Sequence, residues 1–106
     1  MGKHITPLKK PAVNIFMYQD CKKFISDILE CNEISLRTAA TSLHLNVSTV
    51  SRAIKGDRSI SYDIMKKLVK YLNLNKKEKK VFINLVLYDR AKNVINKINT
   101  SYSLIN

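Results

Sequence analysis

Apolar residues recur at intervals of three and four along most of the chain, which is the spacing of amphipathic helices. The first such stretch predicts a helix over residues 15–30. Its apolar side consists of Cys21, Phe24, Ile25, Ile28 and Leu29. No stretch shows the strict alternation of a half-buried strand, so we expect an all-α fold.

Four more helices are predicted after this one. Ser35 is expected to cap a short helix over residues 36–43, and a second short helix follows over residues 47–55. A fourth helix is expected over residues 62–72, with Asn73 as a left-handed stop. The fifth helix is expected to be long, from Asn75 to Lys97. The predicted architecture is a compact five-helix bundle with a long C-terminal helix.

The start of the fifth helix has its own signal. Asn75 and Glu78 are three residues apart and form a pair typical of a capping box. Farther along this helix, more apolar residues occur than one core-facing side needs. The residues that we expect to face another surface are Leu85, Tyr88, Ala91, Val94, Ile95 and Ile98. A dimer interface is the use we favour, and the alternative is that this side folds back on the first helix.

The segment from residue 43 to residue 56 is typical of the turn and second helix of a helix-turn-helix, a DNA-reading motif. Asn46 is expected to place a side-chain oxygen at the start of the helix, and Gly56 to supply a left-handed stop at its end. Val50 and Ile54 are four residues apart on the inner side. The motif as a whole is expected over residues 35–56.

The rest of the chain divides around this motif. Residues 1–13 are expected to form a flexible basic arm, residues 14–98 the helix-turn-helix domain, and residues 99–106 a polar tail. Lys9 and Lys10 in the arm are candidates for reaching a DNA groove. Residues 1–6 also match the loose N-myristoylation pattern, although a simple arm is the interpretation we favour.

The distribution of charge supports a polyanionic partner more than the total does. The formal net charge is +11, but lysine-rich composition alone does not show where a phosphate would bind. Residues 12–34 hold two Lys against two Asp and two Glu, a net charge of −2. Residues 35–60 hold three Arg and one Lys against one Asp, a net charge of +3. The positive charge is therefore concentrated in the segment that contains the motif.

Major-groove docking points the outer side of the second motif helix at base edges. The candidate base-reading residues are Val47, Ser48, Ser51 and Arg52. Arg52 is the strongest candidate, because its guanidinium can bond both O6 and N7 of guanine. The candidate phosphate contacts are Ser35, Arg37, Asn46, Thr49, Lys55 and Arg58. A second basic cluster, Lys76, Lys77, Lys79 and Lys80, is interpreted as a solvated charge run rather than as flanking phosphate contacts.

These residues resemble the Cro/C1-type (XRE-type) helix-turn-helix repressors, without gaps over residues 35–56. A narrower resemblance is to the N-terminal module of a bacterial XRE-like group. It rests on Ile-Phe-x-Tyr-x-Asp over residues 15–20, Ser-x-Arg over 35–37, a likeness to Leu-Ser-x-x-x-Gly-x-Arg over 50–58, with Val in place of the Leu and one more residue before the Gly, and Glu-x-x-x-Phe-x-x-Leu-Val over 78–86. Members of that group usually continue into an additional C-terminal domain. The resemblance implies a lambda-repressor-like fold and a DNA-binding regulator.

Other chemistry finds little support in the residues. XRE-type proteins commonly have Gly where His44 stands, so we interpret His44 as a turn residue with positive φ rather than as a metal ligand. Cys21 and Cys31 lie in one predicted helix, about 15 Å apart, too far for a disulfide. No nucleophile and base occur at recognisable spacing, so we expect no enzyme activity, cofactor or metal. With no signal peptide or membrane-length apolar run, we expect a soluble cytoplasmic protein without a membrane or small-molecule partner.

The sequence therefore predicts a sequence-specific regulator of transcription that binds double-stranded DNA as a homodimer and acts as a repressor. The alternative is a protein-interaction module, such as an antitoxin or co-regulator, built on the same bundle. Non-specific RNA binding is a weaker possibility, because most aromatic residues lie in apolar stripes.

Overall fold

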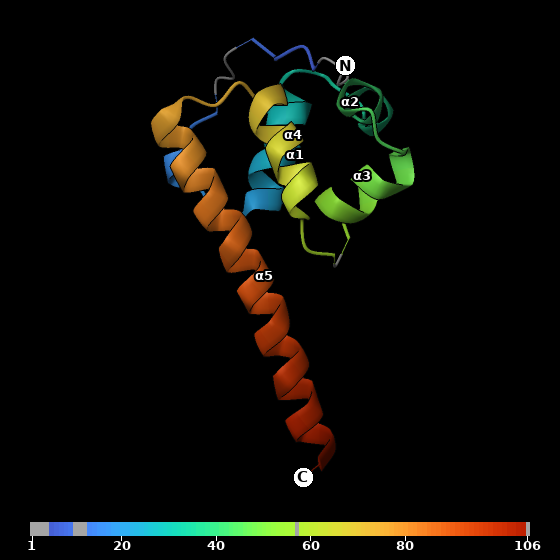
Figure 1. The fold of residues 1–106 in the computed structure, drawn as a ribbon, viewed down its shortest axis with the longest axis vertical. Helices are drawn as coiled ribbons and strands as arrows, with labels where there is room; N and C mark the ends of the chain where they lie inside the picture. Colours follow the sequence, from blue (N-terminus) through green and yellow to red (C-terminus); the bar gives the residue numbers. More distant parts are fainter. Residues whose placement is uncertain (1–4, 10–12, 57, 106) are drawn as a thin grey trace.

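Six helical elements make up the fold in the computed structural model, which describes residues 5–9, 13–56 and 58–105, with side chains described up to residue 98. They are the 3₁₀ turn η1 (Ile15–Met17) and the helices α1 (Cys21–Cys31), α2 (Leu36–Leu43), α3 (Val47–Ile54), α4 (Tyr62–Tyr71) and α5 (Lys76–Ile105). The described residues contain no strand, and the predicted all-α class is confirmed. Figure 1 shows α2 and α3 on one side of α1 and α4, with α5 on the other.

The first predicted helix is wrong at its start. Instead of one helix over residues 15–30, η1 is followed by an extended stretch, and α1 begins only at Cys21. Asn14 caps η1 through a 3.0 Å bond from the Phe16 amide, and Asp20 caps α1 by accepting from the amides of residues 22 and 23. Both caps require extended backbone at the capping residue, which interrupts the helix although the apolar spacing continues through it.

Side-chain caps set the starts of α2, α4 and α5. The hydroxyls of Ser35 and Ser61 accept from the amides three residues later, at 3.1 and 3.2 Å. Asn75 and Glu78 exchange two 2.9 Å bonds and confirm the capping box at the start of α5. Asn73 has φ 55° and confirms the predicted left-handed stop after α4. The short helices α3 and α4 each end one residue before the predicted position.

The long helix α5 extends beyond its predicted end at Lys97 and continues to Ile105. Neither glycine nor proline occurs between these helix limits, so nothing in the local chemistry ends the helix there. Its first half packs against η1, α1 and α4. Its second half projects from the bundle, as Figure 1 shows, and the molecule measures 51 × 29 × 28 Å.

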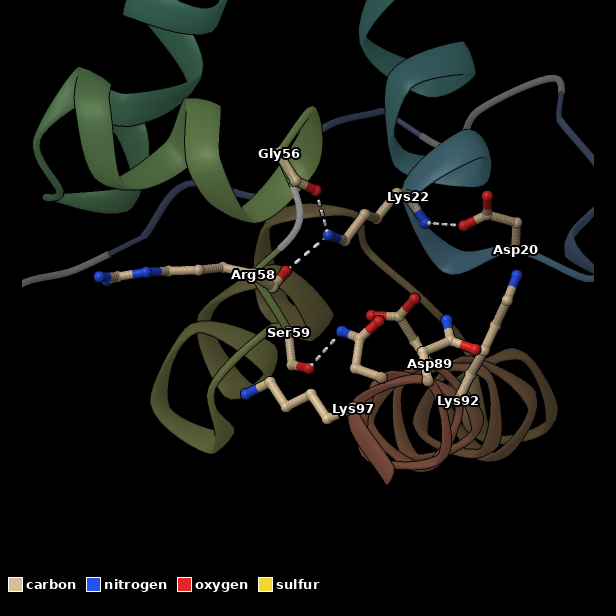
Figure 2. Close-up of a pocket in the computed structure, with 10 residues that line it drawn as sticks. Asp20, Lys22, Gly56, Arg58, Ser59, Asp89, Lys92 and Lys97 are labelled. Atoms are coloured by element: carbon tan, nitrogen blue, oxygen red, sulfur yellow. Dashed lines mark hydrogen bonds between the residues drawn. The ribbon is translucent and has the colours of Figure 1, made fainter. Parts of the chain in front are cut away.

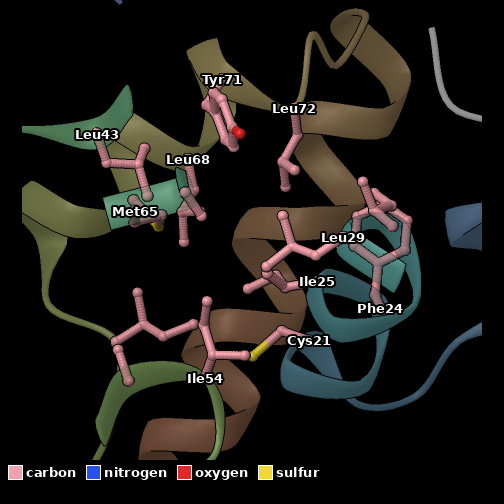
Figure 3. Packing of buried hydrophobic residues seen from close by; sticks show 14 of the residues in the cluster. Cys21, Phe24, Ile25, Leu29, Leu43, Ile54, Met65, Leu68, Tyr71 and Leu72 are labelled. Carbon is pink, nitrogen blue, oxygen red and sulfur yellow. The ribbon is translucent and has the colours of Figure 1, made fainter. Parts of the chain in front are cut away.

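The core lies between α1, α4, α5 and the two motif helices, and Figure 3 shows part of it. All five residues predicted for the apolar side of the first helix are buried. Phe24 is at its centre, with ring centroids 5.3 Å from Tyr18 and 6.2 Å from Phe82. Every buried residue among those that the structure describes is hydrophobic, so burial of apolar surface is what holds these helices together.

The described part of the predicted N-terminal arm lies against the bundle. The Leu8 amide donates to the Tyr71 carbonyl at 2.8 Å, the Asn73 side chain donates to the Leu8 carbonyl at 3.1 Å, and Ile5 is buried. Residues 5–9 are therefore attached to the end of α4 and do not form a free arm. Residues 1–4 and 10–12, which include Lys10, lie outside the described residues. Over the described part of the chain, no helix combines the length and the apolar character that crossing a membrane requires.

Candidate nucleic-acid interface

The turn between α2 and α3 is built around His44. This residue has φ 57° and ψ 43°, which confirms its predicted positive φ. Its amide donates to the Thr41 carbonyl at 3.1 Å, and the Leu45 amide donates to the Ala40 carbonyl at 2.9 Å. These two bonds are the pair of a Schellman motif, which ends α2 and turns the chain into α3.

The start of α3 differs from the prediction in one respect. Asn46 occupies the N-cap position, and its carbonyl accepts from the Val50 amide at 3.1 Å, but its side chain makes no capping bond. The expected side-chain cap is therefore wrong, and the amides of the first turn have no acceptor from Asn46. The side chain is exposed beside the N-terminus of α3.

The buried and the exposed residues of α3 lie on opposite sides of the helix. Val50, Ala53 and Ile54 are buried and attach the helix to the core. Of the predicted base-reading residues, Val47, Ser48 and Arg52 are exposed and Ser51 is half-buried. The structure therefore presents one polar, cationic side of α3 to solvent, with Arg52 on it.

Most of the predicted phosphate contacts are exposed. Arg37, Asn46, Lys55 and Arg58 are exposed, and Thr49 is half-buried. Ser35 is exposed too, but its hydroxyl is engaged at the start of α2, where it donates to the Thr38 hydroxyl at 3.0 Å. The backbone at the N-terminus of α2 is therefore better placed than the Ser35 side chain to meet an anion.

Gly56 follows α3 for a reason other than the predicted one. No described glycine has positive φ, so the expected left-handed stop is wrong. A Cβ on Gly56 would lie 2.8 Å from the Arg52 carbonyl oxygen and 3.1 Å from its Cα. The backbone of the loop passes so close to the last turn of α3 that only glycine fits.

The loop between α3 and α4 is held from two other helices, as Figure 2 shows in part. From α1, the Lys22 ammonium donates to the carbonyls of Gly56 at 2.6 Å and Arg58 at 2.5 Å. From α5, the guanidinium of Arg90 donates to the Ile60 carbonyl through Nε at 3.0 Å and Nη2 at 2.8 Å.

A third side chain, Asn93, also reaches this loop from α5 and donates to the Ser59 hydroxyl at 2.8 Å. Sequence reasoning missed Lys22, Arg90 and Asn93 as supports of the motif. A signal for two of them exists, because Arg90 and Asn93 continue the inner side of α5 that Phe82 and Val86 begin. Polar residues on a core-facing side indicate hydrogen bonds to other protein groups.

One group of potential metal ligands occurs among the described residues. Single ligand atoms of Asp20, Cys21 and Asp89 lie within 4.8 Å of one another, and Oδ2 of Asp89 is buried with no hydrogen-bond partner. Burial first, and then the nearby carboxylates of Asp89 and Asp20, raise the pKa of Cys21 to about 12. The thiol is therefore protonated at neutral pH, and one oxygen of Asp20 already caps α1.

The predicted dimer residues on α5 lie in two environments. Leu85 is half-buried and packs against the core cluster. Tyr88, Val94, Ile95 and Ile98 are each at least half exposed, and Ala91 is exposed. These exposed residues do not fold back on the first helix. The exposed basic residues Lys76, Lys77, Lys79 and Lys80 lie at the start of α5.

Comparison with known families places the motif in context. Residues 27–78 match the model of a family described as Helix-turn-helix. The match begins within α1, contains α2, α3 and α4, and ends in the first turn of α5. No curated protein and no solved structure matches the chain.

Proposed function

The chain carries a Cro/C1-type (XRE-type) helix-turn-helix domain over residues 27–78, and from this we propose that it is a sequence-specific DNA-binding regulator of transcription. The observation that carries the proposal is the orientation of α3. One side of this helix is fixed in the core by Val50, Ala53 and Ile54, and the other exposes Val47, Ser48 and Arg52. An amphipathic helix presented in this way fits the major groove of B-form DNA.

Each exposed side chain has a role that its chemistry suggests. The Arg52 guanidinium bonds O6 and N7 of one guanine, a pairing worth about 1 to 3 kcal/mol of discrimination. Val47 contacts a thymine methyl group. The hydroxyls of Ser48 and Ser51 can hydrogen-bond to more than one kind of base and so discriminate little. Arg52 is therefore the main source of sequence preference.

The phosphate contacts position this helix without reading sequence. Lys55 and Arg58 follow α3 directly, and Arg37 lies in the first turn of α2. The predicted contacts from Asn46, Thr49 and the start of α2 at Ser35 complete the set. Lys22 supports Arg58 by holding its backbone carbonyl.

The regulator acts as a homodimer on a palindromic site, in the cytoplasm, and represses by occupying a promoter. Two copies related by a dyad place their recognition helices in major grooves one helical turn, or a multiple of it, apart. This activity requires binding alone, so the proposal includes no chemical step.

Selection of bound sites from randomised duplex DNA tests the proposal, because it reports sequence preference and half-site spacing together. We expect a defined palindrome. Arg52→Ala should weaken binding to the selected site about 5- to 150-fold, the equivalent of one bidentate base contact, and leave binding to random DNA nearly unchanged. Equal losses on both duplexes contradict the role of Arg52.

Lys55→Ala provides the matched contrast. It should weaken binding to all duplexes and lower the slope of log K against log salt by about one. Lys70→Ala, an exposed lysine on α4 outside the recognition elements, is the control and should leave the slope unchanged. A function that survives reversal of charge at both Arg52 and Lys55 indicates a protein-interaction module instead.

A further inference from the structure

From Tyr88 onward, α5 carries exposed apolar residues on one side. Tyr88, Ala91, Ile95 and Ile98 follow one another at intervals of three, four and three residues, and all four are exposed. The same spacing continues in the sequence at Tyr102 and Ile105, where α5 ends. An alternation of three and four is the a and d spacing of a heptad repeat. We call Tyr88, Ala91, Ile95 and Ile98 the outer stripe.

The outer stripe faces away from the bundle. Successive residues of a helix turn by roughly 100°, so Ile95 points almost opposite to Val86, which is fully buried. The contacts with the α3–α4 loop come from Arg90 and Asn93, which lie on the buried side of the helix. A partner can therefore cover the outer stripe without disturbing either the core or the loop.

From this arrangement we infer that the outer stripe pairs with the outer stripe of a second copy as a parallel two-stranded coiled coil. The inference rests on the proposed function, because a reader of a palindrome needs both DNA-binding bundles at the same end of the coil. In a parallel pair each a residue meets its equivalent. Ile95 meets Ile95 of the second copy, and Ile98 meets Ile98. The small Ala91 pair follows the large Tyr88 pair along the coil.

The charge pattern indicates a second copy rather than an unrelated partner. In this register, Asp89, Arg90 and Lys97 occupy positions b and c, away from the contact. The flanking g positions hold Leu87 and Val94, both at least half exposed. Lys92, at an e position, is then opposite Leu87 of the second copy, and no like charges meet across the flanks. Two strongly basic copies can therefore approach along this side without repulsion between flanking residues.

Cysteine cross-linking tests both the register and the direction of the pair. The background variant is Cys31→Ser, which removes the exposed native thiol and leaves the buried Cys21. Ala91→Cys at a d position should form an interchain disulfide under mild oxidation, at least ten times faster than Lys97→Cys at an outward c position. Equal rates, or no disulfide at Ala91→Cys, overturn the inference. An antiparallel pair gives the second result, because its Ala91 residues lie far apart.

Sedimentation of the full chain without DNA supplies the second measurement. The wild type should have twice the mass of one chain, and Ile95→Asp should shift it to one chain, since the charge is placed in the contact. Lys97→Glu is the control and should remain a dimer. Thermal unfolding monitors the bundle, which both variants leave intact because Ile95 is 54% exposed and Lys97 is also exposed.

A monomeric wild type, or a dimeric Ile95→Asp variant, overturns the inference. Because neither measurement includes DNA, the two proposals can fail separately. A cross-linked dimer that prefers no DNA sequence contradicts the proposed function alone. A chain that is monomeric without DNA but still selects a palindromic site contradicts the coiled coil alone.

Discussion

The ammonium nitrogen of Lys22 lies 2.6 Å from the carbonyl oxygen of Gly56, 34 residues along the chain. The same ammonium also bonds the carbonyl of Arg58, so one side chain of α1 holds both sides of the point where the chain leaves the recognition helix. Figure 2 shows this arrangement. Charge-assisted bonds to backbone are stronger than neutral ones, and these two fix the loop that carries a predicted phosphate contact.

Lys22→Met should therefore destabilise the protein and weaken DNA binding. Methionine keeps the length and apolar contacts of the side chain but cannot bond the two carbonyls, and we expect a loss of about 1 to 2 kcal/mol in the free energy of unfolding. Lys23→Met is the matched control. Its ammonium is 3.2 Å from Asp27 and largely exposed, so its loss should stay below about 0.5 kcal/mol. Urea unfolding measures the free energy of unfolding of both variants. Equal losses in the two variants contradict the role of Lys22.

Gly56→Ala should cost stability through one close contact. The added Cβ would meet the Arg52 carbonyl oxygen at 2.8 Å, and this is a backbone atom that cannot move without bending α3. We expect a loss of about 1 to 3 kcal/mol, which is typical of overpacking. Arg58→Ala in the same loop removes only an exposed side chain and should change stability by less than about 0.5 kcal/mol. A neutral Gly56→Ala result would contradict the close approach.

Acid sensitivity should depend on the bond between Tyr18 and Asp27. The Tyr18 hydroxyl donates to Oδ2 of Asp27 at 2.6 Å, and this bond first, with Lys23 second, lowers the pKa of Asp27. Because the folded pKa lies below the unfolded value of about 3.9, the stabilisation is present above that pH and is lost as the pH falls through the folded pKa.

The same bond, and then burial, raises the pKa of Tyr18. The stabilisation from the protonated Tyr18 hydroxyl is therefore present below the unfolded pKa of about 10 and is lost as the pH rises through the folded pKa.

Tyr18→Phe tests this bond. The variant should raise the pKa of Asp27, as measured by NMR titration, and should be less stable than the wild type at pH 7. The difference in stability should shrink as the pH falls through the folded pKa of Asp27. Tyr62→Phe changes an exposed tyrosine on α4 and should leave the Asp27 titration unchanged. An unaltered Asp27 titration in Tyr18→Phe would show that the bond does not control this carboxyl.

The two cysteines should react with alkylating reagents at very different rates. Cys21 is buried and its pKa is raised to about 12, so little thiolate forms at pH 8. Cys31 is exposed. Mass spectrometry after iodoacetamide treatment should find one label on the folded protein, at Cys31, and two in urea. Labelling of Cys21 in the folded protein at the rate of Cys31 would contradict its burial.

Local chemistry explains which parts of the fold were predictable from the sequence. Apolar spacing predicts the helices. The caps at Ser35 and Asn75 and the left-handed stop at Asn73 were predictable because each depends only on residues a few positions away. The positive φ of His44 followed from the resemblance to XRE-type proteins, which commonly have Gly at this position, and His is one of the few other residue types that tolerate it. The interruption before Cys21 was missed, because Asn14 and Asp20 act as caps only if the helix breaks, and the apolar spacing does not show the break.

The residues that support the candidate interface were harder to predict from the sequence. A glycine after a helix has two common explanations, positive φ and close approach, and the sequence does not distinguish them at Gly56. The bonds from Lys22 and Arg90 join residues 30 or more positions apart, and no periodic pattern records such a pairing. The exposed side of α3, by contrast, followed from the burial of Val50 and Ile54.

The continuity of α5 links two parts of the molecule through a fixed angle. Arg90 bonds the loop beside the recognition helix, and Ile95 lies five residues farther along the same unbroken rod. One alanine inserted between Asn93 and Val94 would rotate everything beyond it by roughly 100° and advance it by about 1.5 Å, with every side chain retained. The direction in which the protruding end of α5 points, relative to the exposed side of α3, is therefore set by the number of residues between them, and evolution or design can change it by insertion or deletion.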